Sequence, residues 1–334
     1  MRNPRVWLGL AISAVCLYIA FHDFNPADLT AALVQARYTW LLPAMLVIAL
    51  SQVVRAYRWG QLFYPDAPPP LGKLFSALSV GYLASTVFPA RLGDVVRAVL
   101  IGGREGQRIA QSFSTVIVER ALDVLSIIVM LVVLLPFVSL PPLLAKSAIT
   151  IGILFVVLFG ALWLAEWQRA RALALVHWLL SRVPRLDADR WTRRVSGLID
   201  GLKIMRAPLP LAKVTLLSLL IWAFGGAFFM YLVMRAFGLQ NEVVPPGSAL
   251  LVAAFAQVVV ALAATAPSSP GYVGVYHVAA VTALEAFGVP HADALAFALV
   301  SHAANFGLII IIGVIFVWRE GLNFGQLTHP QVEG

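Results

Sequence analysis

The chain has 334 residues, of which 60% are hydrophobic and only 12% are charged, and Lys and Arg outnumber Asp and Glu by 24 to 16. Soluble domains carry about 25% charged residues, so this composition leaves too few charges to cover a water-facing surface. The basic residues flank apolar runs, which argues against a nucleic-acid partner and favours orientation signals and contact with anionic lipid headgroups.

Ten apolar segments follow one another along the chain, and a helix needs about 20 residues to cross a hydrocarbon core of about 30 Å. The first segment follows two arginines, as in a signal peptide, but lacks a cleavage pattern of small residues, so we expect it to remain as a span. The fourth is too short to cross. The segments are 5–21, 40–54, 74–88, 92–102, 112–136, 148–165, 212–236, 248–266, 271–287 and 295–317.

The distribution of Lys and Arg predicts the orientation, because these residues collect on the cytoplasmic side of a membrane. The stretch 166–213 holds ten of the 24 basic residues, whereas 137–147 holds only Lys146 and 237–247 holds none. We therefore expect 166–213 to be a cytoplasmic loop. Both termini are then also cytoplasmic, and the protein is expected to be a multi-pass protein of the cell (inner) membrane.

This orientation places every basic segment on the cytoplasmic side only if each of two regions, 74–108 and 248–287, begins and ends on the same side of the membrane. Both are interrupted by turns rich in Pro and Gly, at 88–94 and 267–274. Irregular backbone inside a membrane persists only where protein buries it or a wet cavity borders it. A pair of interrupted helices, one in each half of a chain, is typical of transporters with inverted repeats and a site at the membrane midplane.

The predicted fold class is therefore all-α: a polytopic integral membrane helical bundle with about eight transmembrane segments and two re-entrant or broken-helix hairpins. The predicted domain organisation is a single membrane domain, 1–334. Its candidate inverted halves are 40–136 and 212–317, joined by the basic loop 166–213.

The first interruption is a candidate anion site. Pro89 and Gly93 end one half-helix, and Asp94 is placed to cap the next. A helix N-terminus offers unpaired N–H groups and favours an anion such as a lipid phosphate, and Arg91 and Arg97 add positive charge beside it. A purely structural alternative is that Arg91 and Asp94 pair to close the tip of the hairpin.

The second interruption has the same arrangement with different residues. Ser268 or Ser269 can cap a helix start, and Gly271 and Gly274 allow close approach of the backbone. His277 follows, and it is a candidate for binding a headgroup or a proton. A histidine that is hydrogen-bonded within the bundle is the alternative.

A cluster of charges lies inside the segment 112–136. Glu119 and Asp123 are four residues apart and share a helix face, and Arg120 reaches Asp123. Ionisable groups inside a span are costly and indicate a functional site by default. Either Arg91 or Arg97 is a candidate partner for Glu119, and a buried ion network that only fixes helix packing is the alternative.

Arg55, Arg58 and Trp59 end the second apolar segment, where they fit either a headgroup site or an interfacial anchor. No cofactor is expected, because the sequence contains no Walker loop, no metal-spaced His/Cys/Asp cluster and no arrangement typical of a Ser-His-Asp site. The single cysteine, Cys16, excludes a disulfide framework.

These residues resemble the lysylphosphatidylglycerol synthase transmembrane region, also called the flippase-like membrane family. The family pattern reads Arg-x-x-Arg-Trp, Pro-x-Arg-x-Gly-Glu-x-x-Arg, Glu-Arg-x-x-Asp and Pro-x-x-Pro-Gly-Gly-x-Gly-x-x-Glu. The chain departs from it at three positions, with Asp94 for Glu, Tyr272 for Gly and His277 for Glu. The matching residues occur in the family's order: Arg55, Arg58, Trp59, Pro89, Arg91, Gly93, Arg97, Glu119, Arg120, Asp123, Pro267, Pro270, Gly271 and Gly274.

The resemblance implies a membrane domain that binds and translocates phospholipids or isoprenoid-type lipids. In the best-known members it accompanies a cytoplasmic domain that transfers lysine from aminoacyl-tRNA to phosphatidylglycerol, and 166–213 is too short to hold such a domain. The expected function is a lipid flippase or lipid-binding transporter for an anionic lipid. A lipid-modifying transferase in the membrane and a non-transporting subunit that recruits a partner through 166–213 are the alternatives.

Overall fold

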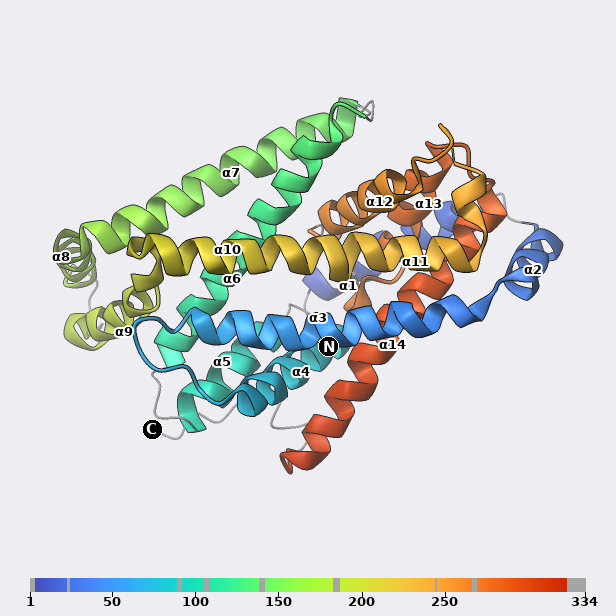
Figure 1. Ribbon diagram of the computed structural model, residues 1–334. Coiled ribbons are helices and arrows are strands. Elements are labelled where there is room, and N and C mark those ends of the chain that lie inside the picture. Colours follow the sequence, from blue (N-terminus) through green and yellow to red (C-terminus); the bar gives the residue numbers. More distant parts are fainter. Residues whose placement is uncertain are drawn as a thin grey trace.

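The computed structural model describes residues 4–22, 25–88, 92–104, 109–137, 142–182, 187–243, 245–265 and 269–322, and all regular elements in these ranges are helical (Figure 1). The N-terminal half contains α1 (Pro4–Phe21), α2 (Pro26–Gln35), η1 (Tyr38–Trp40), α3 (Leu41–Gln61), α4 (Leu71–Val87), α5 (Gly93–Arg104), α6 (Ile109–Leu134) and α7 (Pro142–Trp167). The rest contains α8 (Arg169–Leu180), α9 (Ala188–Asp200), η3 (Lys203–Arg206), α10 (Pro208–Trp222), η4 (Ala223–Phe228), α11 (Phe229–Ala236), η5 (Leu239–Asn241), α12 (Ala249–Ala263), η6 (Pro270–Tyr272), α13 (Val275–Glu285) and α14 (His291–Arg319). The predicted all-α class is confirmed.

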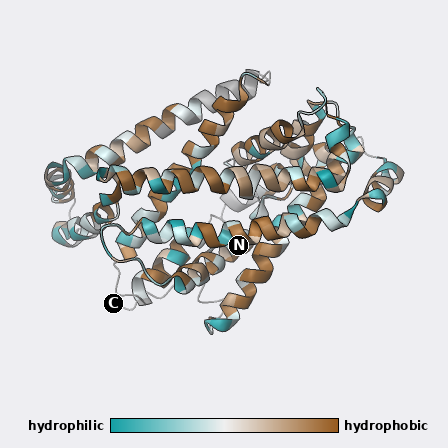
Figure 2. Ribbon diagram, viewed as in Figure 1, coloured by the Kyte–Doolittle hydropathy of each residue, from teal (hydrophilic) through white to brown (hydrophobic). Residues whose placement is uncertain are grey.

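Each of the ten apolar segments coincides with a helix, and the predicted connection at 166–213 is itself largely helical. That stretch contains α8, α9 and η3, and α10 begins within it at Pro208. Helix α9 was not predicted, because it is polar overall and apolar along one face only. Such a helix shows no continuous apolar run. Hydrophobic residues cover most of the long helices, whereas hydrophilic residues gather around α8 and α9 (Figure 2).

Within the described residues, three helical stretches are long and apolar enough to cross a membrane: Tyr38–Gln61, Pro208–Ala236 and His291–Arg319. Two bent pairs, α1 with α2 and α7 with α8, raise this number to five if each pair is one span. The predicted count of about eight is therefore not supported by the described residues. The difference has a physical cause: α6 has the length of a span but contains three charged residues, while α4 and α12 have only 17 and 15 residues.

The two short apolar helices each belong to a helical pair. Helix α4 packs on α5 across the first interruption, and α12 packs on α13 across the second. Backbone contact between α4 and α5 is close, since a Cβ atom added to Gly81 would lie 2.8 Å from the carbonyl oxygen of Gly93. Small residues permit such close approach in membrane bundles, where van der Waals packing holds helices together.

The long stretches α3 and α10–α11 lie side by side, and α14 packs against α3 and α4 (Figure 1). One buried hydrophobic cluster is centred on α11 to α14, and a second joins α3, α4, α6 and η3. The candidate site lies where the two interrupted pairs and these long helices approach one another.

Candidate functional site

Six charged side chains from three helices form a connected network inside the bundle. Three are guanidinium groups and three are carboxylates, so their formal charges cancel. Residues far apart in the sequence are brought together, because α5 and α3 both pack against α6. The members are Arg58 from α3, Asp94 and Arg97 from α5, and Glu119, Arg120 and Asp123 from α6.

Four members are almost completely buried. Arg97 donates to both carboxylate oxygens of Glu119 at 3.0 and 3.2 Å, and both side chains are 0% exposed. Arg58 lies 2.7 Å from Asp123 and 3.2 Å from Glu119. Arg58 also donates to Ser218. Isolated charges in a low-dielectric interior are very unfavourable, so this pairing is what allows α6 to carry charges at all.

The other two members form an ion pair at the border of the network. Arg120 donates to the two oxygens of Asp94 at 2.8 and 3.1 Å, and Arg97 approaches the same carboxylate at 3.0 Å. Arg120 also lies 3.4 Å from Asp123, as expected from their spacing on one helix. Unlike the inner members, Arg120 is 41% exposed.

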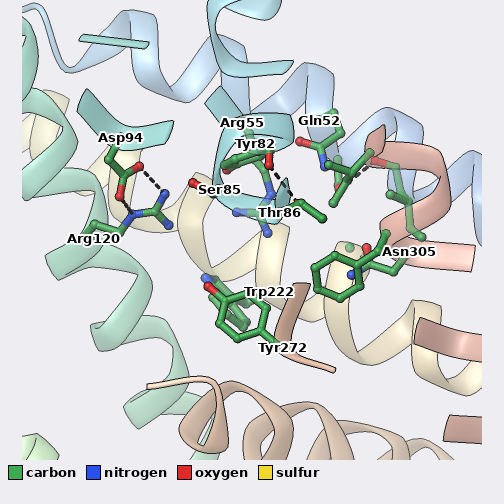
Figure 3. A pocket seen from close by; sticks show the side chains of 15 residues that line it. Gln52, Arg55, Tyr82, Ser85, Thr86, Asp94, Arg120, Trp222, Tyr272 and Asn305 are labelled. Atoms are coloured by element: carbon green, nitrogen blue, oxygen red, sulfur yellow. Dashed lines mark hydrogen bonds and ion pairs between the residues drawn. The ribbon is translucent and has the colours of Figure 1, made fainter. Parts of the chain in front are cut away.

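A polar cavity of about 230 Å³ adjoins this border (Figure 3). The Asp94–Arg120 pair lies at one end of it and Gln52 and Asn305 at the other, with Arg55 between them. The lining comes from α3, α4, α5, α6, the α10–η4 junction, η6 and α14: Ile48, Ser51, Gln52, Arg55, Tyr82, Ser85, Thr86, Asp94, Arg120, Trp222, Gly225, Tyr272, Asn305, Phe306 and Ile309.

Among the described residues that line the cavity, Arg55 is the charged side chain outside the ion network. No carboxylate of the described residues lies within ion-pair distance of its guanidinium group, whose carbon atom lies 5.9 Å from the centre of the Trp222 ring. Since the neighbouring network is neutral, Arg55 gives the cavity a net positive charge. An unbalanced cation in such an apolar bundle creates a strong preference for an anion.

Both interruptions contribute to this cavity. Helix α4 supplies Ser85 and Thr86 just before the first, and Tyr272 belongs to the second. Helix α4 packs against η6, so the helix that precedes the first interruption lies next to the second interruption. His302 of α14 holds the second interruption in place through a 2.8 Å hydrogen bond to the carbonyl oxygen of Gly271.

The expected capping role of Asp94 is wrong. The carbonyl oxygen of Leu92 accepts the first backbone hydrogen bonds of α5, from Val95 and Val96, so the helix starts before Asp94. The side chain of Asp94 is bound to arginines instead. The predicted anion-binding residue Arg91 lies outside the described residues.

The second interruption also differs from expectation. Ser269 precedes the short 3₁₀ turn η6, but its side chain makes no capping hydrogen bond to that turn. Helix α13 starts later, after Gly274, whose φ of +86° suits glycine. His277 is 4% exposed, and its Nδ1 accepts a hydrogen bond from the Gly274 amide, so it caps α13 and does not line the cavity. Ser268 lies outside the described residues.

The idea of an interfacial belt at the end of α3 is also wrong. Arg58 and Trp59 are 0% exposed. Arg58 belongs to the ion network, and the indole N–H of Trp59 donates to Thr115 at 2.9 Å. Only Arg55 reaches the cavity. Glu119 is neutralised by Arg97, one of the two partners expected for it.

Sequence reasoning missed most of the uncharged lining, namely Ser51, Gln52, Tyr82, Ser85, Thr86, Trp222 and Tyr272 as cavity residues. One signal was present, because Gln52 and Arg55 are three residues apart and share a face of α3. Hydroxyl residues in apolar helices carry no such signal, since they are common at helix contacts. Among the residues that the structure describes, no group of three or more His, Cys, Asp or Glu could hold a metal ion.

Apolar helices of spanning length around a buried ionic centre and a positively charged cavity define a multi-pass membrane protein. Residues 6–313 match the model of the lysylphosphatidylglycerol synthase TM region, and the chain belongs to this family. It is also similar to Glycosyltransferase AglD of Haloferax volcanii, with 26% identity over 94% of the chain and 54% of the relative. The chain thus spans about half the length of that relative. No solved structure matches the chain.

Proposed function

We propose that this protein binds and translocates an anionic membrane lipid, a phospholipid or an isoprenoid-type lipid, and that the polar cavity holds its headgroup. The observation that carries the proposal is the position of Arg55, an unbalanced cation in a cavity between two interrupted helices. A phosphate would accept charge-assisted hydrogen bonds from Arg55. The hydroxyl group of Ser85 and the amide group of Asn305 would donate to its remaining oxygens.

The same proposal includes the finer topology. We propose that α4–α5 and α12–α13 enter the membrane from opposite sides as hairpins, within two inverted halves, 40–136 and 212–317. The packing of α4 against η6 supports this arrangement, because it brings the helix that precedes the first interruption next to the second interruption. Both termini would be cytoplasmic, in the cell membrane, as the basic residues indicate.

Transport in reconstituted liposomes tests the proposal. The protein is incorporated into vesicles that contain a fluorescent anionic phospholipid, and the fraction reaching the other leaflet is followed by chemical quenching. Wild type is expected to move the lipid well above protein-free vesicles, and Arg55→Gln is expected to reduce the rate at least tenfold. Arg171→Gln is the matched control, because Arg171 lies exposed on α8.

If wild type and Arg55→Gln move the anionic lipid at the same rate, the proposed headgroup site is wrong. A zwitterionic lipid with the same chains provides a second comparison. Equal rates for the two lipids in wild type would contradict selection by the charge of Arg55.

A lipid-modifying transferase is the second candidate, favoured by the similarity to Glycosyltransferase AglD. General acid–base chemistry needs a titratable group within reach of the reacting atoms. The carboxylates of the described network are all paired with arginines, and Asp94 is the one among them that lines the cavity. Incubation with lipid and labelled sugar or aminoacyl donors tests this candidate, which requires a modified lipid whose formation is abolished by Asp94→Asn.

Recruitment of a partner through 166–213 has less support. Several of its basic groups are engaged within the chain: Arg169 pairs with Asp200, and Arg206 donates to the carbonyl oxygens of Glu166 and Trp167. Pull-down with charge-neutralised α8 and α9 tests this idea, which predicts loss of a captured protein.

A further inference from the structure

A second cavity, of about 310 Å³, lies between α5, α6 and α7. It differs sharply in character from the polar cavity, because all but two of its lining residues are apolar. It is about twice as large as a cavity of about 150 Å³ that accommodates a benzene-sized molecule. The apolar lining residues are Phe113, Val116, Ile117, Ala121, Val124, Leu154 and Leu158. We refer to this space as the apolar crevice.

The two remaining lining residues of the apolar crevice are Asp94 and Arg120, which also line the polar cavity. Their ion pair, which Figure 3 shows from the side of the polar cavity, is therefore shared by the linings of the two spaces. A long arginine side chain suits this position, since its methylene groups favour an apolar surface while its guanidinium group favours a polar one.

The outer wall of the apolar crevice belongs to α7. Leu154 and Leu158 line it, and they are 62% and 49% exposed. Side chains this exposed on an apolar helix of a membrane protein face lipid. The apolar crevice is therefore accessible to hydrocarbon chains from the bilayer.

We infer that the apolar crevice holds a hydrocarbon chain of the lipid whose anionic headgroup occupies the polar cavity, and that Asp94–Arg120 marks the junction between headgroup and chain. This inference rests on the proposed function. An amphiphile is the one ligand class that matches a positively charged space and an apolar space separated by a single ion pair. A water-soluble phosphate would fill the first space and leave the second without an occupant.

Site-resolved photocrosslinking tests the inference. The full-length protein in lipid nanodiscs is exposed to an anionic phospholipid with a diazirine in the middle of one chain, and crosslinked positions are identified by mass spectrometry. A zwitterionic lipid with the same chain is the reference, because it reports general contact with the bilayer. Leu216 on α10, 58% exposed, provides a lipid-facing position away from the apolar crevice.

The anionic-to-zwitterionic labelling ratio at the lining residues of α6, within 113–124, and at Leu154 and Leu158 of α7 is expected to exceed the ratio at Leu216 at least threefold. Arg55→Gln is expected to abolish this excess. Equal ratios at all three places would overturn the inference, since the apolar crevice would then contact only bulk lipid. If the labelling ratios are equal but transport depends on Arg55, only this inference is overturned and the proposed function stands. If transport does not depend on Arg55, both the inference and the proposed function are overturned.

Filling the apolar crevice gives a second test. Leu158→Trp adds bulk at a half-exposed position, and Val157→Trp makes the same change at a neighbouring residue that is 64% exposed and does not line the apolar crevice. Leu158→Trp is expected to slow transport of a long-chain anionic lipid at least fivefold, with Val157→Trp near wild type. Equal transport by the two variants would contradict the inference.

Discussion

Neutralising Glu119 should destabilise the protein severely. The Glu119 carboxylate is 0% exposed and lies 3.0 Å from Arg97 and 3.2 Å from Arg58, which are also 0% exposed. Glu119→Gln keeps the size of the side chain but leaves the buried network with one excess positive charge. Removing one partner of a buried ion pair costs about 3–5 kcal/mol, so we expect a loss of that size in the free energy of unfolding.

The assay is equilibrium denaturation in detergent micelles, applied to wild type, Glu119→Gln, Arg97→Gln and the double variant. Removing both charges restores neutrality. The stability lost in the double variant should therefore be smaller than the sum of the two single losses by about 2 kcal/mol or more. A Glu119→Gln loss below about 1 kcal/mol, or strict additivity of the two changes, would refute the description of a tightly coupled buried network.

Two further predictions concern packing and pH. A Cβ atom at Gly81 would lie only 2.8 Å from the carbonyl oxygen of Gly93, so Gly81→Ala should lower the free energy of unfolding by about 1–3 kcal/mol. Gly160→Ala is the control: a Cβ atom there would have nothing within 4 Å, so the free energy of unfolding should stay unchanged or rise slightly. Equal losses in the two variants would contradict the close α4–α5 contact. At Asp200, burial opposes ionisation, but hydrogen bonds from Arg169 and a neighbouring lysine outweigh it and hold the pKa of Asp200 below its usual value. A lowered pKa contributes stability above the ordinary value of about 3.9 that is lost as pH falls through the lowered value. The protection factors of the α9 amides, which are exchange rates corrected for the intrinsic effect of pH, should therefore stay constant from about pH 7 to 5 and fall only below about pH 4. Asp200→Asn should show the lower protection already at pH 7, and pH-dependent protection in that variant would contradict this assignment.

The helices could be predicted well because long apolar runs carry a strong signal in a membrane protein. The number of spans could not be predicted, since a run of apolar residues does not reveal that α12 stops after 15 residues. Amphipathic helices such as α9 were missed for the opposite reason. Their apolar residues are spread over every third or fourth position.

The charged part of the site was predictable, because ionisable residues inside spans are rare and have to find partners. The sequence pointed to Glu119 and Arg97 but could not divide the network into a buried interior and a border pair that lines a cavity. That division depends on how α5 packs on α6. It also depends on the orientation of α3, because Arg55 and Arg58 lie within one turn of this helix and yet Arg55 lines the cavity while Arg58 belongs to the network.

Binding of anionic lipid at Arg55 tests the central claim most directly. Native mass spectrometry of wild type, Arg55→Gln and Arg171→Gln, titrated with an anionic phospholipid and with a zwitterionic one of the same chains, measures the affinities. A hydrogen bond to a charged group contributes about 1.5–3 kcal/mol, so Arg55→Gln should weaken anionic-lipid binding by roughly tenfold or more, whereas Arg171→Gln should bind like wild type. Binding of the zwitterionic lipid should fall less, because its own cationic group already balances its phosphate. Equal binding of the anionic lipid by all three proteins would contradict a headgroup site in the polar cavity.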